Sequence, residues 1–138
     1  MQSLELLVFE AGGTRFATPL SDLARVVASA QAPPAGALDL GLLAGGQQAS
    51  GEACLVVARW PDATVRIDRV NQVVRVSSGH LHQLPGYIRE HCRLPFIWGL
   101  AELETEAIIV VDLPRLCADG LAAQQASGEG DRQPQRGP

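Results

Sequence analysis

The sequence predicts an all-β protein, made mainly of strands with short helices. Hydrophobic residues make up 46% of the 138 residues, and Val, Leu, Ile and Ala supply most of them, since the chain holds only two Trp, one Tyr and three Phe. Short apolar runs are separated by Gly, Pro and Asp, which is typical of strands joined by turns. The length suits one globular domain with a core of its own, for which we expect residues 1–120.

In the first half, residues 4–10 and 14–19 are expected to form a hairpin, because Gly12 and Gly13 between them tolerate positive φ. Ser21 and Asp22 can cap one helical turn over residues 21–25, before the chain extends again at residues 26–27. The prolines within residues 30–37 predict irregular structure. Residues 37–45 fit a strand or a helical turn, and residues 45–52 predict an exposed loop between two halves.

In the second half, residues 53–60 and 64–70 predict two strands joined by a turn at residues 61–62, followed by a strand over residues 72–78. Alternation places Val74 and Val76 on one face of that strand and Val73 and Arg75 on the other. Residues 80–93 predict a loop with some helix. Residues 96–104 and 107–112 predict two further strands, and the second is apolar at consecutive positions, so both of its faces should be covered.

Near the C-terminus, Asp112 fits the N-cap of a short helix over residues 113–119. Residues 121–138 are rich in Gln, Gly and Pro and lack apolar anchors, so we expect a disordered tail. The strands thus fall into two groups of similar rhythm, which suggests a pair of small barrels.

Charge and hydropathy exclude several classes of function. All eleven basic residues are Arg, and they are dispersed among fifteen carboxylates without the basic run that binding of nucleic acid requires. No apolar stretch approaches the roughly 18 to 20 residues that span a bilayer, and the acidic start does not resemble a secretory signal. We therefore expect a cytoplasmic protein that does not insert into membranes. Three widely spaced cysteines fit reduced thiols.

Candidate chemistry is sparse. His80, His82, His91 and Cys92 are the residue types that bind zinc, but no second short Cys or His pair completes a recognised spacing. A small metal-dependent or thiol enzyme built on these four residues remains an alternative. Glu102, Glu104 and Glu106 flank a predicted turn and suggest a solvated edge. We expect no cofactor, no bound metal and no catalytic residue.

Four segments together resemble the CheW-like coupling domain of chemotaxis, from about residue 4 to residue 116. They are ELLVFEAGGTRFATPLSDLARVV, RIDRVNQVVRVSS, QLPGYI and IWGLAELETEAIIVVDLPRL. No segment is specific alone, whereas their order and spacing are. The motif positions that carry the resemblance are Gly12, Asp39, Asp68, Gly99, Leu100 and Asp112.

The resemblance implies two small SH3-like, five-stranded β-barrels, which we place at residues 1–50 and 51–120. The family has a hairpin carrying Asn-Leu-Arg-Gly and then Pro-Val-Ile-Asp-Leu-Arg. Of these residues AQAPPAGALDLGLLAG retains only Asp39 and Leu40. The first barrel is therefore expected to be truncated.

The resemblance also implies a noncatalytic adaptor, a scaffold for protein-protein interaction in two-component signal transduction. Its partners would be the regulatory domain of a CheA-like histidine kinase and the cytoplasmic tip of a methyl-accepting chemoreceptor, which lies in a groove between the barrels. An alternative is a reduced variant that binds only one of the two. By match to the family, the partner-binding residues are expected to be Leu23, Arg25, Val27, Val70 and Val73.

Overall fold

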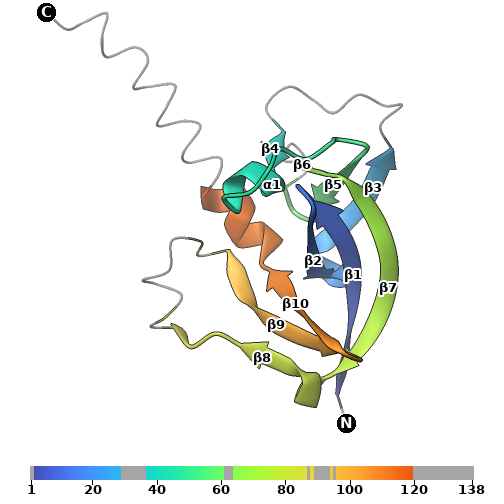
Figure 1. Cartoon of the computed structure of the whole chain (residues 1–138), viewed down its shortest axis with the longest axis vertical. Coiled ribbons are helices and arrows are strands. Elements are labelled where there is room, and N and C mark those ends of the chain that lie inside the picture. Colours follow the sequence, from blue (N-terminus) through green and yellow to red (C-terminus); the bar gives the residue numbers. More distant parts are fainter. Residues whose placement is uncertain are drawn as a thin grey trace, which may run out of the picture.

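Two antiparallel-rich β-sheets form the body of the protein in the computed structural model, which describes residues 2–28, 37–60, 64–86, 88, 94 and 96–119 (Figure 1). The larger sheet, sheet A, has six strands in the order β7-β1-β2-β10-β9-β8. Its strands are β1 (Ser3–Ala11), β2 (Thr14–Pro19), β7 (Arg69–Ser77), β8 (Leu81–Gln83), β9 (Ile97–Leu103) and β10 (Glu106–Val111).

The smaller sheet, sheet B, has four strands in the order β3-β5-β6-β4. They are β3 (Leu23–Ala28), β5 (Ala53–Val57), β6 (Thr64–Ile67) and the short β4 (Leu38–Asp39). The all-β class is confirmed, although the described strands divide six and four, not five and five. The helical pieces are short, as expected: η1 (Leu20–Asp22), α1 (Leu40–Leu43), η2 (Ser78–His80) and a helix over 113–119.

The predicted first hairpin is confirmed. Strands β1 and β2 pair from Leu6 opposite Pro19 to Ala11 opposite Thr14, and Gly12 and Gly13 make the turn with φ of 62° and 83°. A larger residue at Gly12 would be unfavourable for two reasons. The positive φ is strained for a residue with a side chain, and the added Cβ would lie 2.2 Å from the carbonyl oxygen of Gln47.

Strand β1 is buried on both faces and separates two hydrophobic cores. Leu6 and Val8 pack inside the curved sheet A, whereas Leu7 and Phe9 pack on its other face with the residues of sheet B. Strand β10 behaves in the same way, with Val110 in the first core and Val111 in the second, as the consecutive apolar residues predicted. The inter-sheet core also holds Leu113, Leu116 and Cys117 from the C-terminal helix.

Three local predictions need correction or refinement. The helical turn is Leu20–Asp22, one residue earlier than predicted, and no side chain caps it. Strand β3 begins directly afterwards because Leu23 already pairs with Val57 of β5. Residues 37–45 contain both alternatives that the pattern left open, the strand β4 and the helical turn α1.

The boundary expected between residues 50 and 51 does not separate the two sheets. Sheet B contains β3 and β4 from one side of that boundary and β5 and β6 from the other. Sheet A likewise combines the first hairpin with the last four strands, because β1 pairs with β7 and β2 runs parallel to β10. The irregular segment at 30–36, the turn at 61–62 and the tail at 121–138 lie outside the described residues.

Three aspartates at motif positions fix the connections. Asp39 accepts hydrogen bonds from the backbone N–H of Leu42 and of Ala49, and Asp112 accepts one from Arg115 N–H at 3.2 Å. The predicted N-cap at Asp112 is therefore confirmed. Asp68 accepts from Gly13 N–H at 3.0 Å and Ser50 N–H at 2.7 Å, so it ties the first hairpin to the loop before β5.

The two described cysteines, Cys54 and Cys117, are buried and free, which fits the reduced thiols that the sequence predicted. Burial raises the pKa of Cys117 to about 11 and also raises the pKa of Cys54. Cys92 lies outside the described residues.

Asp68 should make stability depend on pH. Burial by itself would raise the pKa of Asp68, but the N–H groups of Ser50, Gly13 and Gly12 donate to the carboxylate, and the net effect lowers it. A lowered pKa contributes stability above the unfolded-state value, and this stability is lost as pH falls through the folded-state value. We expect Asp68→Asn to be about 1 kcal/mol less stable than wild type near neutral pH.

The same difference should shrink as pH falls below about 4, because protonated Asp68 is then a poorer acceptor in the wild type as well. Urea unfolding across this range measures it. Glu104→Gln, which removes an exposed carboxylate from a turn, is the control for loss of charge. A difference that is constant with pH would contradict the assigned role of the carboxylate.

Thr18 offers a second test of the packing. It is fully buried on β2, and its Oγ1 has no hydrogen-bond partner among the described groups. Thr18→Val keeps the shape and removes the desolvated hydroxyl, so we expect the free energy of unfolding to rise by about 1 kcal/mol. Thr14→Val, at an exposed position of the same strand, should change it by less than about 0.5 kcal/mol. Destabilisation by Thr18→Val would show that the hydroxyl has a partner.

Candidate protein-interaction surface

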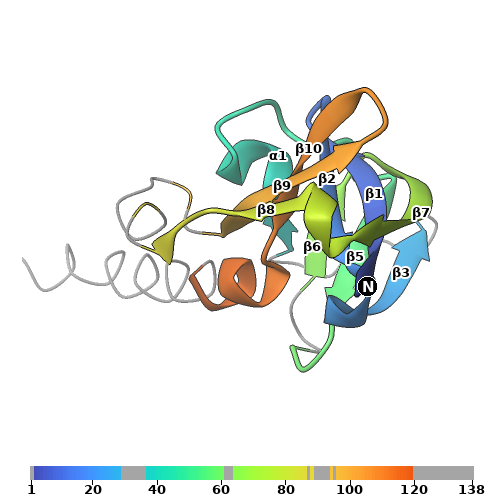
Figure 2. The ribbon, with the colours of Figure 1, turned by 90° about the horizontal axis from the view of Figure 1, so that it is seen from below.

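Among the described strands, the exposed valines lie on terminal strands of the two sheets. Strand β3 lies at one end of sheet B and β7 at one end of sheet A. Val26 on β3 is 44% exposed, and Val70 and Val73 on β7 are 37% and 50% exposed. Both strands lie on the same side of the molecule in two perpendicular views (Figures 1 and 2). We call Val26, Val70 and Val73 the inter-sheet rim.

The register of β7 shows which face its valines occupy. Val70 pairs with Phe9 and Val73 with Leu7, and directly paired residues of antiparallel strands project to the same face. Leu7 and Phe9 belong to the core between the sheets. The two valines therefore point toward sheet B, but they lie at the edge, beyond the point where sheet B covers them.

The register of β3 gives the matching result. Val26 pairs with Leu55, a residue of the inter-sheet core, so it projects to the face of sheet B that meets sheet A. A register irregularity between Leu23 and Arg25 leaves Leu23 on this same face, packed against the core. All three rim valines thus extend the inter-sheet core to the surface.

Further along β7, at Arg75, lies a shallow groove of about 430 Å³. Its lining includes Leu20 of η1, Glu5 of β1 and Arg75 of β7. The Arg75 guanidinium lies 3.9 Å from the Glu5 carboxylate, and both side chains are largely exposed. The surface between the sheet edges therefore combines apolar side chains with one pair of opposite charges.

The structure divides the predicted partner-binding residues into three groups. Val70 and Val73 are together in the inter-sheet rim. Leu23 is half-buried against the core. Arg25 and Val27 pair with Val56 and Cys54, so they project to the opposite face of sheet B, where Arg25 is exposed.

Sequence reasoning missed Val26. The residues chosen in β3 were 23, 25 and 27, which share a face only if the strand alternates without interruption. The irregularity at Ala24 shifts the alternation, so Leu23 shares its face with Val26. The segment LARVVA carries no Gly or Pro that would have indicated it.

The two remaining predicted positions, Gly99 and Leu100, lie on β9. At Gly99 an added Cβ would lie 2.1 Å from the carbonyl oxygen of His82, so this glycine permits the close approach of β8 to β9. Leu100 on β9 is exposed.

Comparison with solved structures then identifies the architecture. The scaffolding protein TtCheW from Thermoanaerobacter tengcongensis superposes with a TM-score of 0.63, over 80% of this chain and 89% of that one. The chain has the CheW fold. The sequence identity is 15%, and neither a family model nor a curated protein matches this sequence.

The CheW fold does not bring the predicted metal ligands together within the described residues. His82 contacts the Glu102 carboxylate, and His80 lines a cleft that Glu102 also lines, while His91 and Cys92 lie outside the described residues. No group of three metal-binding side chains occurs in the part of the chain that the structure describes. None of the described helices is long and apolar enough to cross a membrane.

Proposed function

We propose that this protein is a noncatalytic adaptor that couples chemoreceptors to a CheA-type histidine kinase in chemotaxis-type signal transduction, in the cytoplasm. The CheW fold supports the class of protein. The observation that carries the proposal is the inter-sheet rim, an extension of the core that reaches the surface where the two sheets separate.

The rim suits the helical tip of a receptor. An amphipathic helix presents apolar side chains along one face, and Val26, Val70 and Val73 offer an apolar counterpart that no described residue fully covers. The adjacent groove holds the Glu5 and Arg75 charges, which can pair with polar residues at the border of such a helix.

Arg25 and Val27 serve the kinase regulatory domain in this proposal. They project from the face of β3 opposite the rim, so a partner bound there leaves the rim free. Arg25 makes no ion pair with another described residue, and a guanidinium on an edge strand can bind a partner carboxylate. An adaptor that holds both partners raises the effective concentration of each for the other.

Val73→Asp tests the rim. We expect it to weaken binding of a chemoreceptor cytoplasmic fragment by at least about tenfold, because it places a charge in an apolar contact. The melting temperature should hardly change, since Val73 is half exposed. Isothermal titration calorimetry measures the affinity. Leu42→Asp, at an exposed leucine of α1, is the matched control and should bind as wild type does. Equal binding by both variants would remove the rim from the site.

Arg25→Glu tests the opposite face. Binding of a CheA-type regulatory domain should weaken by about tenfold, while receptor binding and thermal stability stay near wild type. Both partners are titrated separately against wild type and variant. Binding of wild type to one partner alone would favour the reduced adaptor with a single partner surface. Failure to bind either at high micromolar concentration would refute the proposed function.

A further inference from the structure

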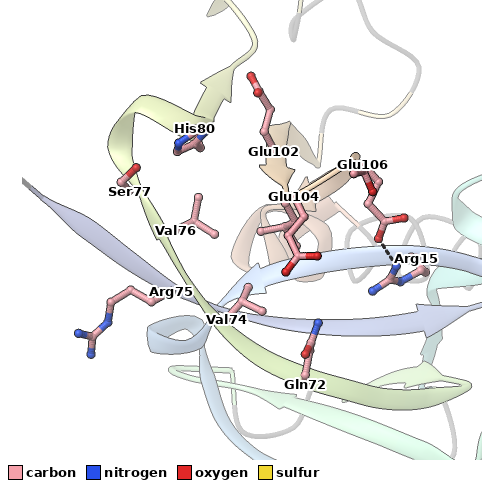
Figure 3. A pocket seen from close by; sticks show the side chains of 12 residues that line it. Arg15, Gln72, Val74, Arg75, Val76, Ser77, His80, Glu102, Glu104 and Glu106 are labelled. Atoms are coloured by element: carbon pink, nitrogen blue, oxygen red, sulfur yellow. Dashed lines mark hydrogen bonds and ion pairs between the residues drawn. The ribbon is translucent and has the colours of Figure 1, made fainter.

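A second surface lies on the other side of β7. A cleft of about 770 Å³ opens between β7 and the turn that joins β9 to β10 (Figure 3). Val74 and Val76 point into it from β7, and Glu102, Glu104 and Glu106 border it from the hairpin. The rim valines are not part of this cleft.

The cleft lies between two strand edges that have no further strand beside them among the described residues. Strand β7 is the terminal strand of sheet A and pairs with β1. Strand β9 pairs with β8 only through Gly99, Leu100 and Ala101, so the edge at 102–103 continues beyond β8. Alternate residues of an edge strand direct their N–H and C=O groups away from the sheet, and these groups can pair with an added strand.

The lining of the cleft is apolar at its base, and its border is charged, with Glu102, Glu104 and Glu106 beside Arg15, Arg75 and His80. Val74, Val76 and Leu103 belong to the core inside sheet A or pack against it. At the border, Glu102 contacts His82 and Glu106 contacts Arg15. Glu104 lies in the turn with a positive φ of 50°. It has no ion pair among the described residues.

From these features we propose that the cleft binds an extended segment of a partner protein, which pairs with β7 as an additional strand of sheet A. Every second side chain of that segment is apolar and packs on Val74, Val76 and Leu103. At one end of this row a Lys or Arg takes the place of an apolar residue and pairs with Glu104, and the alternate side chains point away from the cleft. Backbone pairing supplies the affinity, and the alternating side chains supply the specificity.

An extended segment fits this site better than a helix does. A helix satisfies its own backbone hydrogen bonds, so it would leave the edge groups of β7 and β9 without protein partners. The rim valines of β7, Val70 and Val73, project from the opposite face of that strand, so the two surfaces are distinct.

The proposal can be tested with a displayed library of random linear peptides selected against the full chain. Enriched peptides should alternate apolar and polar residues and carry at least one Lys or Arg. For the strongest binder, Glu104→Lys should weaken binding by about fivefold. Glu52→Lys, the same charge reversal in an exposed loop away from the cleft, is the matched control and should have no effect.

Hydrogen exchange separates strand addition from charge attraction alone. The bound peptide should slow exchange of alternate amides within residues 72–77, and replacement of one central peptide residue by Pro should weaken binding by about tenfold. Val26→Asp, a rim substitution on β3 and not on β7, should leave peptide binding unchanged, which keeps this result independent of the receptor site. No enriched peptide, or binding that is insensitive to both Glu104→Lys and Pro, would overturn the proposal.

Discussion

The burial of β1 on both faces is the constraint on which the rest of the structure depends. Leu6 and Val8 face the interior of sheet A, and Leu7 and Phe9 face sheet B. A slip of one residue would exchange these two sets, and Phe9 would then have to fit where Val8 packs. The glycine turn and the Asp68 hydrogen bonds hold the register at the end of the hairpin where such a slip would begin. Two cores are thus fixed by one strand.

The exposed surface follows from this arrangement. Strand β7 is terminal in sheet A and pairs with β1, so one face of β7 points toward the inter-sheet core and the other toward the core within sheet A. Each face extends beyond the residues that cover it. Val73 emerges on the first and Val74 borders the cleft on the second. The two proposed interaction surfaces therefore both arise because neighbouring residues cover the two faces of β7 only in part.

Local sequence patterns were sufficient to predict the elements that depend on a few neighbouring residues. The first hairpin, the doubly buried β10 and the Asp112 cap were all predicted, because glycine turns, consecutive apolar residues and capping side chains act over a few residues. The sheet membership was not, because the pairing of β1 with β7 joins residues far apart in the chain. The irregularity at Ala24 was not predicted either, so the sequence named Val70 and Val73 as candidates but not Val26.

The edge strands also carry features that limit unwanted association. Exposed edges with apolar side chains can pair with other chains, and charged residues at the edge reduce this tendency. Strand β3 carries Arg25 beside Val26, and β7 carries Arg69 and Arg75 around its two exposed valines. Arg69 binds Glu10 at 2.9 Å, which holds it along the sheet and leaves Val70 accessible. The arginines of β7 are balanced by Glu10 and Glu5, whereas Arg25 has no ion pair among the described residues. A partner with a carboxylate is therefore favoured at β3, and two copies of the β3 edge repel each other. The β3 edge can therefore stay open to a complementary partner while it remains unfavourable for self-association.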